Sequence, residues 1–166
     1  MKKILFVFAG GGFLNESVPL YDALKKKFKI ELVVSKDIDY ECLPDIVKMD
    51  NVKLSYMMPV TLRSQSSLQN SLMLLRATVE AFFILAKNDA EYIICLGSSM
   101  ALPLFFIAKL LQKKTIFIES IARVEGLSKT ASTLLKLRIV DRCYVQWEEQ
   151  ESEIQNSLVL YKGSVL

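Results

Sequence analysis

Short apolar runs alternate along this chain with segments whose apolar residues recur at helical spacing. The runs KILFVF, at Lys3–Phe8, and KIELVVS, at Lys29–Ser35, are typical of strands covered on both faces of a sheet. Between them, apolar residues recur every four positions and predict a helix over Glu16–Phe28. This alternation predicts an α/β fold with a doubly wound parallel sheet. The length of 166 residues suits a single domain, 1–166.

The same pattern continues to the end of the chain. Further strands are predicted at Val52–Met57, Glu91–Leu96, Thr115–Ile118, Arg142–Gln146 and Leu158–Tyr161. Further helices are predicted at Leu68–Lys87, Met100–Lys113 and Lys129–Ile139, the last with Ser128 as its N-cap. Since ligands of such sheets bind beyond the carboxyl ends of the strands, the loops that matter are 9–16, 97–100 and 119–126.

The composition excludes several function classes. The chain has no histidine, which removes Ser-His-Asp and Cys-His nucleophiles, histidine metal ligands and a histidine general base. A net charge of +3 is too small to indicate a nucleic-acid partner. Cys42, Cys95 and Cys143 lie far apart without CxxC spacing, so we interpret them as buried thiols in a reducing cytoplasm. We expect no metal and no cofactor.

Two apolar segments raise the question of export or membrane insertion. Ile4–Ala9 has six residues, and an export signal needs about 7–15. Tyr92–Ala108 carries no charge over 17 residues, but Gly97 and Pro103 are typical of a strand, a turn and a helix. With 52% apolar residues and a mean hydropathy of +0.31, some apolar surface is expected against a partner or a bilayer.

The loop after the first strand contains Gly10, Gly11 and Gly12. Three glycines leave main-chain N–H groups unobstructed at a helix start, where the helix dipole favours an anion such as phosphate. The loop does not fit the dinucleotide motif GxGxxG, because Asn15 occupies the place of the third glycine. A tight turn without a ligand is the alternative.

The turn after the fourth strand is Gly97-Ser98-Ser99. It directs hydroxyl and N–H groups toward one point, next to the glycine loop in the predicted sheet. The alternative is that the serines only cap the following helix.

Glu119, Ser120 and Arg123 follow the fifth strand. A carboxylate, a hydroxyl and a guanidinium in five residues suit a sugar hydroxyl and a phosphate together. The alternative is an internal ion pair between Glu119 and Arg123 that shapes the loop.

The helices predicted at Leu68–Lys87 and Met100–Lys113 are more apolar than one sheet face requires. The simplest interpretation is core. The alternative is that part of this surface contacts a membrane or a partner, with Lys109, Lys113 and Lys114 facing anionic headgroups.

Four blocks of the sequence resemble one family. AGGGFLNE resembles its SxGGHLxE opening, and GSSMALPLFFIAKLL, FIESIARVEGLSKTA and DRCYVQWEE resemble its later blocks. The family comprises the acceptor-side subunits of split glycosyltransferases. It includes the membrane-associating half of the eukaryotic dolichol-linked N-acetylglucosaminyltransferase and bacterial PssD, EpsE and CpsF-like proteins of capsule and exopolysaccharide synthesis. The resemblance runs nearly end to end and implies a Rossmann-like half of a GT-B enzyme, similar to the N-terminal domain of MurG.

The resemblance also implies a function. The chain would bind a polyprenyl-diphosphate-linked sugar acceptor, peripherally on the cytoplasmic face of the cell membrane. A second polypeptide would carry the nucleotide-sugar site, so the chain alone is expected to be inactive or weakly active as a transferase. The implied catalytic residues are Glu16 and Glu119. Among acceptor and phosphate ligands, the resemblance implies Gly11, Gly12, Ser120 and Arg123. With the loops argued from the residues themselves, the expected ligands are Gly10, Gly11, Gly12, Asn15, Gly97, Ser98, Ser99, Ser120 and Arg123.

One residue departs from the family pattern, because Phe13 stands where the motif has histidine. If that histidine is a base or a phosphate ligand in relatives, its role here falls to Glu16, to Glu119 or to the partner. Otherwise the chain is an activator without catalytic groups. We expect the partner to contact the apolar end of the chain, at Leu158, Tyr161, Val165 and Leu166.

Two alternatives to a transferase subunit stay open. One is a non-catalytic anchor and activator of the partner enzyme. The other is a free-standing nucleotide-binding oxidoreductase, with Asp37 after the second strand as its ribose ligand.

Overall fold

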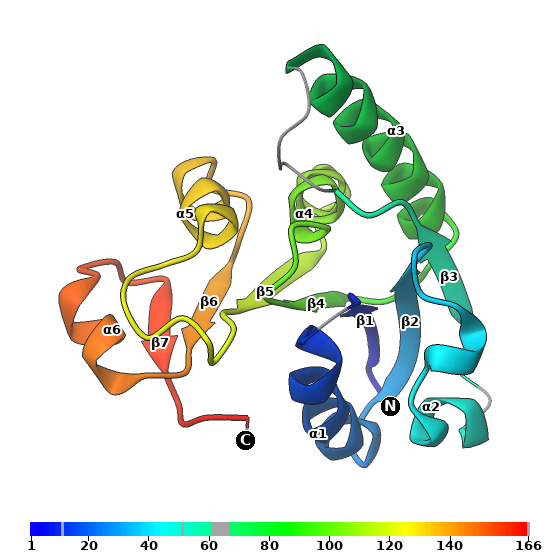
Figure 1. Cartoon of the computed structure of the whole chain (residues 1–166), viewed down its shortest axis with the longest axis horizontal. Helices are drawn as coiled ribbons and strands as arrows, with labels where there is room; N and C mark the ends of the chain where they lie inside the picture. The colour runs from blue at the N-terminus through cyan, green and yellow to red at the C-terminus, as the bar shows by residue number, and fades with distance from the viewer. Residues whose placement is uncertain (11, 51, 61–66, 166) are drawn as a thin grey trace.

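The structure is a computed structural model that describes residues 1–10, 12–50, 52–60 and 67–165. In this part of the chain, parallel strands form one seven-stranded sheet in the order β3-β2-β1-β4-β5-β6-β7 (Figure 1). The strands are β1 Lys3–Phe8, β2 Lys29–Ser35, β3 Leu54–Met57, β4 Tyr92–Leu96, β5 Lys114–Ile118, β6 Arg142–Val145 and β7 Val159–Tyr161. Strand order reverses at β1, which confirms the predicted doubly wound α/β fold.

Helices cover both faces of the sheet. They are α1 Phe13–Lys25, α2 Asp45–Met49, α3 Ser67–Ala86, α4 Ala101–Leu110, α5 Lys129–Lys136 and α6 Glu148–Glu153, with a 3₁₀ turn at Tyr40–Cys42. Figure 1 places α1 and α2 on one face and α3, α4 and α5 on the other, while α6 lies beside β7. Both termini of the described chain lie on the α1 side in this view.

Alternate residues of β1 enter two separate cores. Leu5 and Val7 are fully buried among residues of α3, α4 and α5. Phe6 and Phe8 are fully buried on the other face, where the rings of Phe8 and Tyr21 meet edge to face at 5.9 Å. Each such side chain contributes about 1.5–3 kcal/mol on burial. Because the central strands are covered on both faces, their carboxyl edge is held rigidly.

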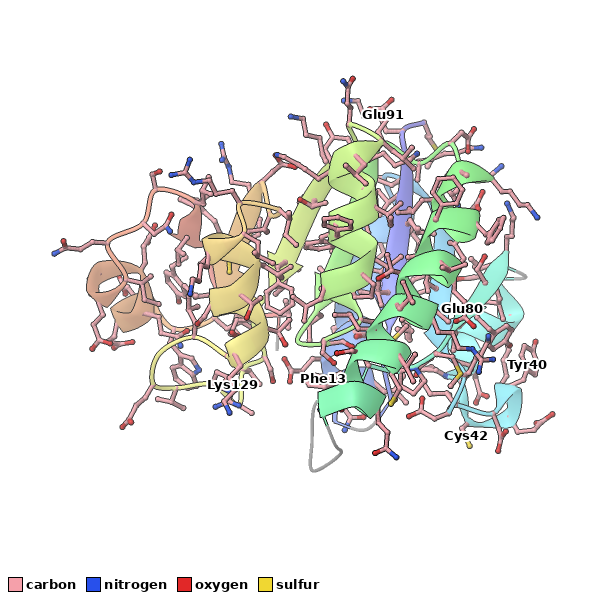
Figure 2. The ribbon with its side chains drawn as sticks, turned by 90° about the horizontal axis from the view of Figure 1, so that it is seen from above. Phe13, Tyr40, Cys42, Glu80, Glu91 and Lys129 are labelled. Atoms are coloured by element: carbon pink, nitrogen blue, oxygen red, sulfur yellow. The ribbon has the colours of Figure 1, made fainter. Side chains whose placement is uncertain are left out.

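Helix α3 packs on α4 rather than directly on the centre of the sheet. Ala77, Ala81 and Leu85 form its buried face. Glu80 ties the helix to the end of β3, since its carboxylate accepts from Met58 N at 2.7 Å and from the Lys36 ammonium at 2.6 Å (Figure 2). Large apolar side chains are also exposed on these two helices, on α3 at Leu72, Leu74, Leu75, Val79, Phe82 and Phe83, and on α4 at Phe106 and Leu110. The all-core interpretation of these helices is therefore wrong.

Element boundaries differ from prediction mainly at helix ends. Helix α1 begins at Phe13 rather than Glu16. Helices α4 and α5 end early because Gln112 and Arg138 adopt left-handed backbone conformations, with φ of 56° and 54°. The predicted Ser128 cap is confirmed, as its Oγ accepts from Ala131 N at 3.1 Å. Helices α2 and α6 are too short to show periodicity and were missed.

Two interpretations of apolar residues change with the structure. Cys95 and Cys143 are buried as predicted, but Cys42 is exposed, because it lies in the 3₁₀ turn at the surface. Tyr92–Ala108 forms β4, a turn and most of α4 rather than a membrane span. Among the described residues, no helix has both the length and the apolarity to cross a bilayer.

Candidate functional site

The three predicted loops meet at the carboxyl edge of the sheet. Strand β1 pairs with β4, and β4 pairs with β5, so the loops that follow these strands are neighbours at the point where strand order reverses. In Figure 2, Phe13, Cys42 and Lys129 lie toward this end of the molecule, and Glu91 lies at the opposite end. The three loops are therefore neighbours, as predicted, at the edge where sheets of this kind bind their ligands, and the site itself stays a prediction.

The turn at Gly97 is closed by an aromatic ring. Gly97 has a φ of +63°, and the Phe13 ring lies where a Cβ of any other residue would be. The ring also packs against both cores. Glycine is required here both for its backbone conformation and for close approach of the ring. The turn after β4 is thus covered by the first residue of α1, which we did not expect from the sequence.

The polar groups of this turn bind other groups of the chain. Gly97 N–H donates to the Ile118 carbonyl at 2.8 Å. Ser98 Oγ, which is buried, accepts from Met100 N at 3.2 Å, and Ser99 Oγ donates to a carbonyl before α3, that of Val60. Ser98 thus accepts from an N–H group just before α4, in partial agreement with the capping alternative, whereas Ser99 does not cap the helix but binds the segment before α3. Their role as acceptor ligands stays a prediction.

The glycine loop is open at its end. Gly10 is half-buried, and a Cβ there would meet Ile38 at 3.3 Å. Gly12 is the exposed N-cap of α1, and no side chain caps the start of this helix. A Cβ added at Gly12 would meet no atom within 4 Å. Asn15 is also exposed, and Gly11 lies outside the described residues. The accessible N–H groups of this loop are therefore those at the start of α1, where the helix dipole favours an anion.

Glu16 joins α1 to the loop after β5. Its carboxylate is 5% exposed, and both oxygens are used. Oε1 accepts from Ser120 Oγ at 2.6 Å, while Oε2 accepts from Ile121 N at 2.9 Å. Oε2 also accepts from Gln146 Nε2 at 3.1 Å. Glu16 therefore holds the first turn of the 119–126 loop against the helix that carries the open glycine.

Glu119 closes the same loop from inside. It is 1% exposed, and its carboxylate accepts from Ser120 N at 3.1 Å and from Ser128 N at 2.7 Å. The loop is thereby tied at both ends to one carboxylate. Arg123 is exposed, and among the described residues no ion pair joins it to Glu119, so the internal-pair alternative is not supported. Its guanidinium remains available to a ligand.

Three further residues hold this loop and were not identified from the sequence as site residues. They come from one segment, in which Gln146, Trp147 and Gln150 donate side-chain N–H groups to loop carbonyls at 2.8–3.0 Å. The carbonyls belong, in that order, to Glu119, to Ile121, and to Arg123 and Gly126 together. The available signal was a glutamine directly after a buried strand, in the block DRCYVQWEE.

The carboxylates of Glu16 and Glu119 both accept hydrogen bonds from the 119–126 loop or its flanks. Glu16 and Glu119 are buried and surrounded by donors of their own chain, so in this conformation neither presents a free oxygen to a substrate. The catalytic role expected for them stays a prediction, and the geometry gives them a holding role.

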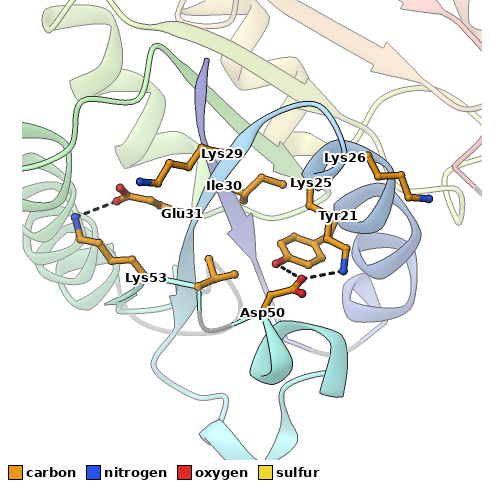
Figure 3. A pocket seen from close by; sticks show the side chains of 9 residues that line it. Tyr21, Lys25, Lys26, Lys29, Ile30, Glu31, Asp50 and Lys53 are labelled. Atoms are coloured by element: carbon orange, nitrogen blue, oxygen red, sulfur yellow. Dashed lines mark hydrogen bonds and ion pairs between the residues drawn. The ribbon is translucent and has the colours of Figure 1, made fainter. Parts of the chain in front are cut away.

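Two cavities lie at the opposite, amino edge of the sheet. One, of about 650 Å³, lies where α1 meets the starts of β2 and β3 (Figure 3). There Tyr21 and Lys25 donate to Asp50, both at 2.9 Å. Burial and the Asp50 carboxylate raise the pKa of Tyr21. The other, of about 760 Å³, is lined by four cations, Lys109, Lys114, Arg138 and Arg142. Sequence reasoning predicted neither cavity, since it considered only the carboxyl edge.

The end of the chain is partly built into the domain. Val165 packs against the α1-side core, and Tyr161 packs against the other core. Leu158 is half-buried, and Leu166 lies outside the described residues. The residues expected to contact a partner are thus less free than their sequence suggested.

Comparison with known proteins identifies the family. The model of the family described as "Oligosaccharide biosynthesis protein Alg14 like" matches residues 4–164. The chain belongs to this family. None of the curated proteins matches the chain. The resemblance stated from the sequence is confirmed at the level of the Alg14-like family, and the specific likeness to PssD, EpsE and CpsF-like proteins stays a prediction. The family gives no support to the oxidoreductase alternative built on Asp37.

Solved structures show the same fold. MurG of Acinetobacter baumannii is 14% identical with a TM-score of 0.72, and the match covers 98% of this chain and 45% of MurG. UDP-GlcNAc 2-epimerase of Neisseria meningitidis, bound to UDP-GlcNAc, is 15% identical with a TM-score of 0.68, over 98% and 47%. LpCGTa in complex with UDP is 12% identical with a TM-score of 0.65, over 100% and 53%. The chain spans about half the length of these proteins and has the fold of one half of a GT-B glycosyltransferase.

Proposed function

We propose that this Alg14-like chain is the acceptor-side subunit of a two-component glycosyltransferase. It binds a polyprenyl-diphosphate-linked sugar, and a partner with a nucleotide-sugar site extends that sugar, in capsule or exopolysaccharide synthesis. The observation that carries the proposal is the open start of α1 at Gly12, beside a rigidly held loop that exposes Arg123. Both lie at the sheet edge where α/β proteins bind ligands.

The acceptor diphosphate is proposed to bind between these two elements. The N–H groups at the start of α1 and the Arg123 guanidinium are two features of this edge that can bind an anion. Glu16 links these two elements, because it lies in the first turns of α1 and its carboxylate accepts from Ser120 Oγ, in the loop that carries Arg123, at 2.6 Å. A pre-positioned pair of this kind binds a diphosphate with little loss of side-chain freedom.

The general base for the acceptor hydroxyl is proposed to come from the partner. Sugar transfer with inversion requires a base within hydrogen-bond reach of that hydroxyl. Because Glu16 and Glu119 are engaged with their own loop, this chain supplies binding and positioning instead. The same observation favours the second candidate function, a non-catalytic anchor and activator.

The exposed apolar face of α3 and α4 is proposed to lie on the cytoplasmic face of the cell membrane. Leu75, Phe82 and Phe83 on α3 are 62%, 47% and 56% exposed, and Leu110 on α4 is 67% exposed. A face of this kind inserts at the boundary between headgroups and acyl chains, as amphipathic helices do. Lys109, next to Leu110, is also exposed, but its ammonium pairs with Asp141 at 3.3 Å, so the proposal rests on the apolar side chains.

A binding experiment tests the diphosphate site. Farnesyl diphosphate serves as a short probe, titrated by calorimetry against the protein and two variants. Gly12→Ala fits without contact and should bind as wild type. Gly12→Asp places a negative charge at the helix start and should weaken binding about tenfold or more. Equal binding by both variants would remove the proposed site.

An activity experiment separates the two candidate functions. The chain is co-expressed with the product of the neighbouring reading frame, and transfer from a panel of nucleotide sugars into lipid-extractable product is measured. An acceptor-binding subunit predicts that Arg123→Ala raises the KM for acceptor without lowering complex formation. An anchor predicts an unchanged KM. Glu125→Ala, in the same exposed loop, is the matched control.

Flotation with vesicles tests the membrane face. The double variant Leu75→Ser with Phe82→Ser should lose most binding to vesicles that contain anionic lipid. Met49→Ser removes an 83% exposed apolar side chain at the end of α2, on the other face of the sheet, and should float as wild type. Flotation of the double variant at the wild-type level would exclude this face.

A further inference from the structure

Gln146 connects the carboxylate that holds the loop to the last described residues of the chain. It follows β6 and is 4% exposed. On one side, Nε2 donates to Glu16 Oε2 at 3.1 Å and to the Glu119 carbonyl at 2.8 Å. On the other side, Oε1 accepts from Val165 N at 2.9 Å and from Ser164 Oγ at 3.1 Å. Both ends of one buried amide are therefore fully used.

The orientation of this amide is determined by its partners. The Nε2 side faces two acceptors, and the Oε1 side faces a main-chain donor, so an exchange of oxygen and nitrogen would break the contacts with Glu16, with the Glu119 carbonyl and with Val165 N. A buried polar network of this kind is stable only when every member is paired. When the tail is lifted, Oε1 loses both of its donors, so contacts on that side no longer fix the side chain, and we expect it to move.

The tail, residues 162–165, reaches Gln146 through a turn at Gly163. The φ of Gly163 is +99°, a conformation that residues with a Cβ rarely adopt, and no atom lies within 4 Å of a Cβ position there. Beyond the turn, the Val165 side chain packs against the α1-side core. Tail docking therefore depends on one glycine that touches neither Gln146 nor the loop.

We propose that Gln146 is a positioning residue that couples the tail to the 119–126 loop, so that docking of residues 162–165 sets the conformation of that loop. Gln146 touches no proposed ligand and acts through Glu16 and the Glu119 carbonyl. Anything that lifts the tail from the domain loosens the loop. The consequence for acceptor binding rests on the proposed function, but the coupling itself is a property of this chain alone.

The protein contains its own reporter for this coupling. Trp147 is the only tryptophan in the sequence, and its indole N–H donates to the Ile121 carbonyl in the loop at 2.8 Å. Its emission maximum and its quenching by acrylamide therefore follow the packing of the loop. The Ile121 amide, which donates to Glu16, reports the same contact by hydrogen exchange.

Gly163→Ala strains the tail without a steric clash and tests the proposal. We expect red-shifted Trp147 emission, stronger quenching, and exchange of the Ile121 amide about tenfold faster than in wild type. Lys162→Ala, at an exposed neighbouring position, should change none of these. Protection of the Val7 amide in β1 reports whether the fold is intact.

A double-variant cycle separates coupling from general destabilisation. In a Gln146→Leu background, Gly163→Ala should have no further effect on Trp147 or on the Ile121 amide, because the connection is already cut. Equal effects of Gly163→Ala in both backgrounds would overturn the proposal. An unchanged loop in Gly163→Ala and after deletion of residues 163–166 would overturn it too. No ligand is used, so a failure of the proposed function leaves these measurements unaffected.

Discussion

Two glycine turns at the carboxyl edge look alike in sequence and differ in structure. Gly97 has a left-handed φ of +63° and lies under the Phe13 ring. Gly12 has an ordinary helical φ of −58° and faces open space. Phe13 follows Gly12 directly and has a part in both turns. Its ring covers Gly97, and its backbone begins α1, the helix that follows Gly12. Glycine at a strand-to-helix turn therefore serves close packing in one case and leaves room for a ligand in the other.

The 119–126 loop belongs with the closed turn. It carries an exposed arginine, but its main chain is held by two buried carboxylates and three donors from one segment. The edge thus combines two rigid loops with one open helix start. If this comparison is correct, substitutions in the closed elements cost stability, whereas substitutions at Gly12 do not.

The largest expected effect is that of Gly97→Ala. The left-handed backbone and the overlap with Phe13 together should lower the free energy of unfolding by about 2–4 kcal/mol. Gly12→Ala is the matched control and should change it by less than about 0.5 kcal/mol. Urea denaturation followed by circular dichroism measures both. Equal midpoints for the two variants would contradict the distinction between a closed and an open turn.

Glu119→Gln should have the next largest effect. The substituted amide can accept from only one of the two N–H groups that the carboxylate now binds, so a buried donor loses its partner. A loss of about 1–3 kcal/mol in unfolding free energy is expected. Glu125→Gln, at an exposed position of the same loop, should be neutral. Should both variants unfold at the same urea concentration, the loop is not held from inside.

Cys95 probes the closed turn through pH. It precedes Gly97 in β4, and burial raises the pKa of its thiol from 9.0 to about 12. Between these values the unfolded thiol ionises while the folded thiol keeps its proton, so stability falls as pH rises. Above pH 9, the unfolding free energy of the wild type should fall by about 1.4 kcal/mol per pH unit relative to that of Cys95→Ala. Unfolding at pH 8 and pH 10 measures it.

Cys42 is the control for this measurement. Cys42→Ala removes an exposed thiol and is measured at the same two pH values, to account for the loss of a cysteine as such. A pH-independent difference for Cys95→Ala would mean that water reaches the strand beneath the turn.

The smallest expected effect is the stability change of Gly12→Asp. A negative charge at the start of α1 interacts favourably with the helix dipole, so the variant should gain a few tenths of a kcal/mol. The same variant is expected to lose diphosphate binding. Opposite signs for stability and binding are the sharpest mark of a ligand position, because a structural residue would lose both. If Gly12→Asp is destabilised instead, Gly12 serves packing, as Gly97 does.

Local patterns were sufficient for most of the fold. β2 was predicted at its observed bounds, Lys29–Ser35, because a central parallel strand is a continuous apolar run between breakers. The Ser128 cap followed from the same kind of local signal. Helix ends were missed at Gln112 and Arg138, where residues other than glycine take the left-handed conformation and no sequence signal marks the stop.

The candidate site divides in the same way. The edge of the sheet, the open glycine loop and the exposed Arg123 could be located from strand order and turn composition. The roles of Glu16, in the first turns of α1, and of Glu119, directly after β5, could not, since a carboxylate at either position has the same appearance in sequence whether it faces solvent or donors of its own chain. Gln146 and Trp147 were also missed as site residues, because their partners lie in a different loop.

The sequence by itself determined the alternation of strands and helices and, through it, the edge at which a ligand can bind, since both follow from interactions within a few residues. Only the tertiary structure decided that Phe13 covers Gly97 and that Gln146 joins Glu16 to the tail. The contact between Gln146 and Glu16 spans 130 residues. Its existence depends on the order of the strands in the sheet and on the exact position at which each strand ends, which no local pattern encodes.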